Sequence, residues 1–177
     1  MNYWITTDTH FNHEKMVTKF KTRDKGFEDK ILRGFKILSE EDIFIHLGDV
    51  SFGRDVYWNS IIGKLTCKKW LLIGNHDKHS IPWYLKHGWD FVVHSMTLKL
   101  MGHTILFSHV PEPFTGENYT INIHGHFHDN DHRYREPYLV KIKNDRQHLL
   151  AIENNNYQLF NLNSVLRDFE KVRKKDD

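Results

Sequence analysis

The chain has 177 residues, and its shares of hydrophobic (39%) and charged (27%) residues are typical of a folded globular protein, which excludes a disordered chain. The formal net charge, 25 − 23 = +2, is too small to indicate a nucleic-acid-binding protein. Cys67 is the only cysteine, so no intrachain disulfide can form, and no signal peptide or membrane-spanning segment is recognisable. We therefore expect one domain over residues 1–177, a cytoplasmic location and no membrane partner.

The first half of the chain alternates short apolar runs with helical patterns. Continuous apolar runs that end at a polar residue or glycine indicate buried strands, and apolar residues spaced three or four apart indicate helices. The expected strands are 3–6, 43–47 and 70–73. The expected helices are 27–39, 56–65 and a segment that begins at Ser80 and ends at Gly88.

The second half changes to hairpin-like patterns. Met101-Gly102-His103 separates two apolar runs, 91–100 and 104–107, and this predicts a hairpin. The remaining expected elements are strands over 119–123 and near 138–142, 149–152 and 157–160, and a closing helix from Asn163. Together the two halves predict an α/β fold, a layered αββα sandwich of two mixed β-sheets flanked by helices.

Histidine, aspartate and asparagine follow five of the expected strands at the point where each strand ends. Because α/β folds build their sites at such strand ends, we expect these side chains to meet. The five segments are Asp8-Thr9-His10, Gly48-Asp49, Gly74-Asn75-His76-Asp77, Ser108-His109 and His124-Gly125-His126-Phe127-His128.

These residue types suit a divalent metal site. Imidazole and carboxylate ligands together favour borderline ions such as Zn, Mn and Fe. Asp8 and His10 are two residues apart, so an extended backbone would place both side chains on one side, and the same holds for His126 and His128. The carboxylate of Asp49 has two oxygens and can bridge two ions. Glycine precedes three of the candidate ligands and lets the backbone turn sharply there.

The five segments, in this order, closely resemble the motif blocks D-x-H, G-D, G-N-H-D/E, H and G-H-x-H of the calcineurin-like metallophosphoesterase superfamily. The segment 151–157, Ala-Ile-Glu-Asn-Asn-Asn-Tyr, also resembles the terminal strands of small bacterial and phage members. The resemblance therefore covers nearly the whole chain.

The resemblance implies two metal positions that share Asp49. One position would take Asp8, His10, His128 and Asp49, and the other would take Asp49, Asn75, His109 and His126. The implied cofactors are two divalent ions, with Mn preferred and Fe, Zn or Ni as alternatives. Two such ions carry four positive charges, of which the carboxylates of Asp8 and Asp49 would neutralise two. A hydroxide and an anionic phosphate would neutralise the remaining two.

The implied reaction is hydrolysis of a phosphate mono- or diester, with a small nucleotide-type ester as the expected substrate. A metal-bridging hydroxide would attack phosphorus, and His76 would stabilise the transition state or protonate the leaving oxygen as the catalytic acid. The protein phosphatases of the superfamily have a second Asp after G-D, which is absent here, and Arg54 is offset by one position. This weakens a protein-phosphatase assignment. We expect Arg54, His13 and Asp77 as further substrate contacts.

Two other functions remain open. A nuclease acting on DNA or RNA would need a basic strip with aromatic residues beside the site, and its activity would depend strongly on salt. A non-catalytic scaffold of the same fold would lack the catalytic histidine, whereas His76 and all seven candidate ligands are present.

Overall fold

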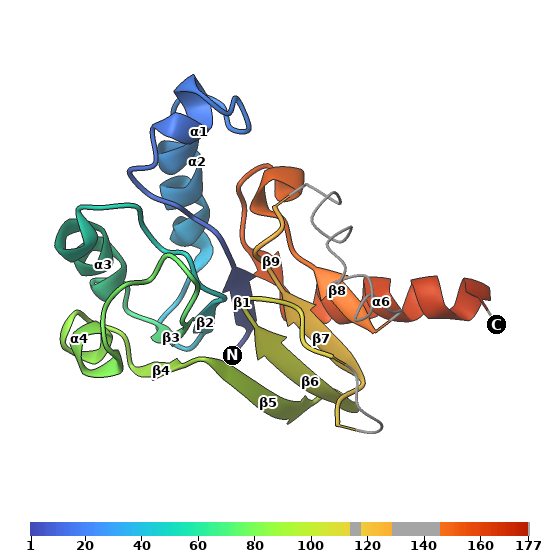
Figure 1. Ribbon diagram of the computed structural model, residues 1–177. Coiled ribbons are helices and arrows are strands. Elements are labelled where there is room, and N and C mark those ends of the chain that lie inside the picture. Colours follow the sequence, from blue (N-terminus) through green and yellow to red (C-terminus); the bar gives the residue numbers. More distant parts are fainter. Residues whose placement is uncertain (114–117, 129–145, 177) are drawn as a thin grey trace.

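The computed structural model describes residues 1–113, 118–128 and 146–176, and it contains two β-sheets that pack face to face with helices around them (Figure 1). The fold prediction is therefore confirmed: this is an α/β fold with two mixed sheets and flanking helices. The expected strand near 138–142 lies outside the described residues.

The first sheet has five strands in the order β4-β3-β2-β1-β9. Four of them are parallel, and β9 pairs with β1 in the antiparallel direction. Their bounds are β1 (Tyr3–Thr6), β2 (Ile43–His46), β3 (Lys68–Leu72), β4 (Phe91–Val93) and β9 (Phe160–Asn161). All four residues of β2 are buried, because both faces of the sheet are covered. This explains why β2 reads as a continuous apolar run.

The second sheet has four strands in the order β5-β6-β7-β8. Their bounds are β5 (Ser95–Leu100), β6 (His103–Ser108), β7 (Ile121–His124) and β8 (Gln147–Leu149). The predicted hairpin around Met101 exists, but its first strand begins at Ser95. Residues 91–93 instead form β4, which pairs with β3 in the first sheet, so the run 91–100 crosses from one sheet to the other.

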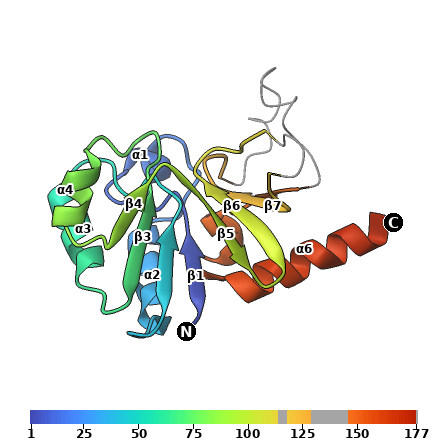
Figure 2. The ribbon, with the colours of Figure 1, turned by 90° about the horizontal axis from the view of Figure 1, so that it is seen from below.

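Most of the helices lie on the face of the first sheet that points away from the second sheet (Figure 2). The last helix of the chain instead packs on the other side, in the hydrophobic cluster shared with the second sheet. The bounds are α1 (Lys15–Thr18), α2 (Phe27–Gly34), the 3₁₀ turn η1 (Phe35–Ile37), α3 (Asp55–Gly63), α4 (Ile81–Lys86), the 3₁₀ turn η3 (Ile152–Asn155) and α6 (Leu162–Asp176). None of the helices within the described residues is long and apolar enough to cross a membrane.

Two hydrophobic clusters lie on opposite faces of the first sheet. Phe44 of β2 packs with Ile31 of α2 and Ile62 of α3 on the helix side. Ile45, its neighbour along β2, points the other way and packs with Phe107 of the second sheet. This alternation fixes which residues of β2 face each layer. Because β1, β2 and β3 run parallel, their carboxyl ends, which carry the polar residues, lie at one edge of the sheet.

Candidate metal centre

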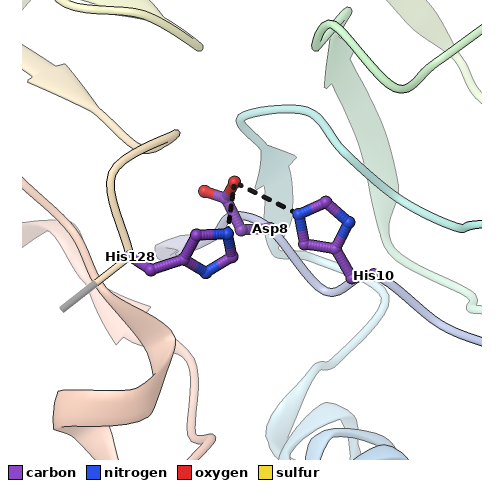
Figure 3. A group of neighbouring side chains, drawn as sticks. All are labelled: Asp8, His10 and His128. Carbon is purple, nitrogen blue, oxygen red and sulfur yellow. Dashed lines mark ion pairs between the residues drawn. The ribbon is translucent and has the colours of Figure 1, made fainter. Parts of the chain in front are cut away.

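Six of the seven predicted ligands gather in two clusters at the carboxyl ends of the strands. One cluster is Asp8, His10 and His128, and the other is Asp49, His109 and His126; within each, the ligand atoms lie within 4.8 Å of one another. Figure 3 shows the first cluster, in which both imidazole rings face the Asp8 carboxylate. The distances from Asp8 Oδ1 to His10 Nε2 and to His128 Nε2 are 3.7 and 3.8 Å.

The carboxylate of Asp49 lies between the two clusters. Its Oδ2 is 3.5 Å from His10 Nε2 on one side and 3.4 Å from His109 Nε2 on the other. The seventh predicted ligand, Asn75, is also brought here, since its Oδ1 lies 3.0 Å from His109 Nε2. The two clusters are thus parts of one centre, and Asp49 is within reach of both.

The two oxygens of Asp8 have different surroundings. Oδ2 accepts hydrogen bonds from the Thr7 hydroxyl and, at 2.8 Å, from the backbone N–H of His126. Oδ1 is buried and has no hydrogen-bond partner among the described residues, and it faces His10 and His128. A buried carboxylate oxygen left without a donor is costly unless a cation takes the place of one. The donor set and this free oxygen fit a divalent metal ion.

The backbone at the ligands is not extended, contrary to the expectation for Asp8-x-His10 and His126-x-His128. All four of these residues, and Asp49, have φ values between +45° and +72°. The left-handed conformation is unfavourable for residues with a Cβ, and such strain is typical of functional sites. Backbone bonds between loops hold it in place; for example, the N–H of Asp8 donates to Gly48 O at 2.9 Å.

Two glycines allow the ligand loops to touch. Gly48 has φ +101°, and a Cβ there would lie 2.6 Å from the backbone nitrogen of Gly74. A Cβ on Gly74 would in turn collide with the Asp49 carboxylate. The loops that carry Asp49 and Asn75 therefore approach each other at backbone distance, as the glycines in the sequence indicated.

The buried charges of the centre stabilise one another. Burial alone would raise the pKa of Asp8, but interaction with His10 and the charges of His109 and His128 lower it well below the usual range. Burial likewise opposes ionisation of Asp49, and His109 lowers its pKa. Burial would lower the pKa of His109, whereas Asp49 raises it to about 9. The carboxylates of Asp8 and Asp49 therefore favour the ionised form, and their negative charge would stabilise a cation bound between them.

Two residues to which the sequence assigned no role, Glu153 and Arg23, contact the candidate ligands on the side away from the metal positions. Glu153 Oε1 lies 2.9 Å from His128 Nδ1, and the same oxygen accepts bonds from Arg23 Nε and an Arg23 terminal nitrogen at 2.9 and 2.7 Å. Arg23 also donates to Thr9 O at 2.7 Å and to the backbone oxygen of Asp8. Glu153 lies in the segment that resembles small family members, but no pattern pairs it with Arg23, 130 residues away.

The three expected substrate contacts lie in different surroundings. The Asp77 carboxylate is buried and accepts backbone N–H bonds from Asp49, Val50 and Gly74 at 2.8 to 3.1 Å. Asp77 thus joins the two ligand loops. Arg54 is exposed, and its guanidinium lies 4.7 Å from the centre of the Tyr57 ring.

His13 is the third expected contact, and it lines a cavity of about 410 Å³ that opens beside the metal centre. Burial lowers the pKa of His13 to about 4, so the ring is neutral at neutral pH. His76 lines the same cavity, and its ring centre is 5.3 Å from that of His10. Candidate ligands from both clusters line this space: His10 and His128 from the first, and Asp49 and His126 from the second.

The overall structure is similar to one solved structure, and two further solved structures match parts of the chain. A protein of unknown function from Aquifex aeolicus is 29% identical, with a TM-score of 0.70 over 97% of this chain and 98% of that one. The nuclease MPE from Pseudomonas putida is 20% identical, with a TM-score of 0.47 over 71% of this chain and 61% of that one. An archaeal phosphodiesterase is 17% identical, with a TM-score of 0.46 over 72% and 74%. No curated protein sequence matches the chain.

The family comparison covers almost the whole sequence. The sequence model of the calcineurin-like phosphoesterase family matches residues 1–175, a range that contains all the candidate ligand loops. The match agrees with the resemblance of the five motif segments, and the two His/Asp clusters are consistent with a binuclear metal centre. The chain therefore belongs to the calcineurin-like phosphoesterase family.

Proposed function

We propose that this chain is a binuclear metal-dependent phosphoesterase that hydrolyses a phosphate mono- or diester of a small nucleotide type. The observation that carries the proposal is the juxtaposition of two ligand clusters and His76 around one open cavity. The free Oδ1 of Asp8 supports it, because that oxygen needs a cation.

The metal ligands are proposed as seven residues in two sets that share Asp49. The first set is Asp8, His10, His128 and Asp49, and the second is Asp49, Asn75, His109 and His126. Mn is the preferred metal, with Fe, Zn or Ni as alternatives, since imidazole and carboxylate ligands suit all of them. When bound, two such ions would activate water as a nucleophile and neutralise charge on a phosphate.

The protein's own contribution is to hold these ligands and to place a proton donor beside them. The backbone N–H of His76 donates to Asp49 Oδ1 at 2.8 Å, which fixes His76 relative to the centre. Burial lowers the pKa of the His76 ring, and the charge of Asp49 opposes this shift. An anionic phosphate in the cavity would act in the same direction as Asp49 and favour the imidazolium, which could protonate the leaving oxygen.

The test compares Mn-loaded protein with a His76→Ala variant on matched phosphate mono- and diesters, including cyclic nucleotides. We expect the variant to lose at least about 100-fold in kcat while it keeps its metal content, because a proton donor contributes rate and no ligand bond. His79→Ala is the matched control, since His79 is also half-exposed but pairs with Asp55. Full activity of His76→Ala would exclude the acid role. No hydrolysis of any ester by wild-type protein would favour the scaffold function.

A further inference from the structure

One wall of the cavity consists of a short segment that the metal centre does not use. His13, Met16, Phe20 and Thr22, in and around α1, all line the cavity on the side of His10. Phe20 is 53% exposed, although a phenylalanine side chain gains free energy when it is buried. Its exposed surface therefore borders the same space as the metal ligands.

The rings of this wall are arranged as flat, neighbouring surfaces. His13 stacks on Phe52 with ring centres 4.0 Å apart and an angle of 9°, and the Phe20 ring stands edge-on to His13 at 6.2 Å. Phe52 is 41% exposed and is 5.4 Å from the ring of His76. A series of ring contacts thus connects Phe20, through His13 and Phe52, with the side chain proposed as the proton donor. We call Phe20, His13 and Phe52 the aromatic wall; Phe20 and His13 line the cavity, and Phe52 stacks on His13 without being a lining residue.

The segment that carries the wall is also basic. Lys15, Lys19, Lys21 and Lys25 are all exposed, and the Nζ of Lys19 lies 5.8 Å from the centre of the Phe20 ring. The formal charge of the whole chain is only +2, so these lysines are a local concentration that the overall composition hides. A nucleic-acid substrate would need a basic strip with aromatics beside the site; residues 13–25 carry four exposed lysines and Phe20, together with the exposed acidic residues Glu14 and Asp24.

We propose that the aromatic wall binds the nucleobase of a phosphodiester whose phosphate lies at the metal centre. The proposal rests on the proposed function and names its substrate class. Bases stack on aromatic side chains without regard to sequence, and lysines attract the neighbouring phosphates. A cavity of about 410 Å³ is of the size that encloses a small ligand.

The chemistry of the wall favours a flat, polar-edged group over an acyl chain. The flat rings of Phe20 and His13 provide stacking faces, and the polar side chain of Thr22 lines the same cavity. An acyl chain would gain most from an enclosed aliphatic surface, and Met16 is the one aliphatic side chain in this wall. The exposed lysines suit an anionic substrate with more than one phosphate.

The experiment measures binding and hydrolysis separately. Binding of thymidine 5′-monophosphate and of deoxyribose 5-phosphate is measured by calorimetry on wild-type protein and on Phe20→Ala, Phe20→Tyr and Phe91→Ala. Phe91 is a matched control, because it is 40% exposed and is not among the residues that line the cavity. Hydrolysis by Mn-loaded protein is measured on a thymidine dinucleotide and on the same diester without bases.

We expect the base to improve binding by about 10-fold in wild-type protein, in Phe20→Tyr and in Phe91→Ala, and to give no advantage in Phe20→Ala. The kcat/KM for the dinucleotide should fall by the same factor in Phe20→Ala, while the base-free diester is unaffected. Equal binding of the two phosphates to wild-type protein would overturn the base subsite. If base-dependent binding is found but no ester is hydrolysed, the subsite stands and the proposed function fails.

A second comparison distinguishes a small nucleotide from a nucleic-acid strand. Binding of thymidine 5′-monophosphate and of a ten-residue single strand is compared at low and high salt in wild-type protein and in Lys19→Gln/Lys21→Gln. A strand that binds at least 10-fold more tightly, with a salt dependence that the double variant reduces, supports a nucleic-acid source of the base. Equal affinity supports the small nucleotide. If the double variant binds the strand as tightly as wild type, Lys19 and Lys21 do not contribute to strand binding, and this part of the proposal fails.

Discussion

Glu153 Oε1 lies 2.9 Å from Nδ1 of His128, the ring whose Nε2 faces Asp8. The carboxylate thus fixes the tautomer that leaves Nε2 free for a metal ion, and it increases the basicity of the ring. Both side chains are largely but not fully buried, and each favours the charged form of the other: Glu153 raises the pKa of His128 against the effect of burial. Glu153, from the 3₁₀ turn η3, therefore supports a site whose first candidate ligand is residue 8.

A Glu153→Ala variant should bind Mn about 10- to 100-fold more weakly, because His128 loses the group that orients it. The measurement is calorimetric titration of metal into chelator-treated protein. Glu170→Ala provides a matched control, since Glu170 also pairs with a histidine, His103, at 3.0 Å but on the exposed surface. Unchanged metal affinity in Glu153→Ala would contradict a positioning role.

Replacement of Arg23 should destabilise the protein strongly. Its guanidinium is fully buried and binds Glu153 together with the backbone oxygens of Asp8 and Thr9. Arg23→Met would remove the guanidinium from Glu153 and leave the backbone oxygens of Asp8 and Thr9 without this donor, and we expect a loss of about 3 kcal/mol in the free energy of unfolding. Urea denaturation measures this. Lys30→Met, which breaks the exposed pair with Asp24, should cost less than about 1 kcal/mol. Similar losses in both variants would contradict the prediction.

Asp77→Asn tests whether this residue holds the ligand loops. The carboxylate of Asp77 accepts hydrogen bonds from the backbone N–H groups of Asp49, Val50 and Gly74. In the asparagine variant an NH₂ group would replace one of its two oxygens, so that donor would face donor. We expect the free energy of unfolding to fall by about 2 kcal/mol and metal affinity to fall with it. Asp29→Asn on the exposed side of α2 is the control. Unchanged stability combined with a raised KM would instead support a substrate contact.

The pH dependence of stability should contain a contribution from Asp42, far from the metal centre. Burial alone would raise its pKa, but bonds from Asn2 and Ser39 lower it to about 2. Because an unfolded aspartate has a pKa of about 3.9, the folded state is favoured above this pH, and the contribution is lost as the pH falls toward 2.

The Asp42→Asn variant should therefore be less stable than wild type by about 1–2 kcal/mol at pH 7, and the difference should shrink below about pH 4. Thermal unfolding at several pH values measures it, with the exposed Glu41→Gln as control. A difference that is constant from pH 7 to pH 2 would exclude ionisation of Asp42 as its cause.

The sequence by itself determined the residue types of the site and their order. Asp, His and Asn after apolar runs identified the ligand loops, because buried parallel strands read as continuous apolar segments and end where the site is built. It also determined the layered α/β fold. The prediction of extended backbone at Asp8 and His10 was wrong, since period-two spacing does not reveal a left-handed φ.

Only the tertiary structure decided which groups meet across long stretches of chain. Arg23 and Glu153 are 130 residues apart, and Phe20 lines the cavity from a segment for which the sequence predicted neither a helix nor a strand. Residues 91–93 join the first sheet because β4 pairs with β3, although their pattern continues into β5. Such pairings depend on burial and on geometry shared between distant segments, and no local pattern in either segment encodes them.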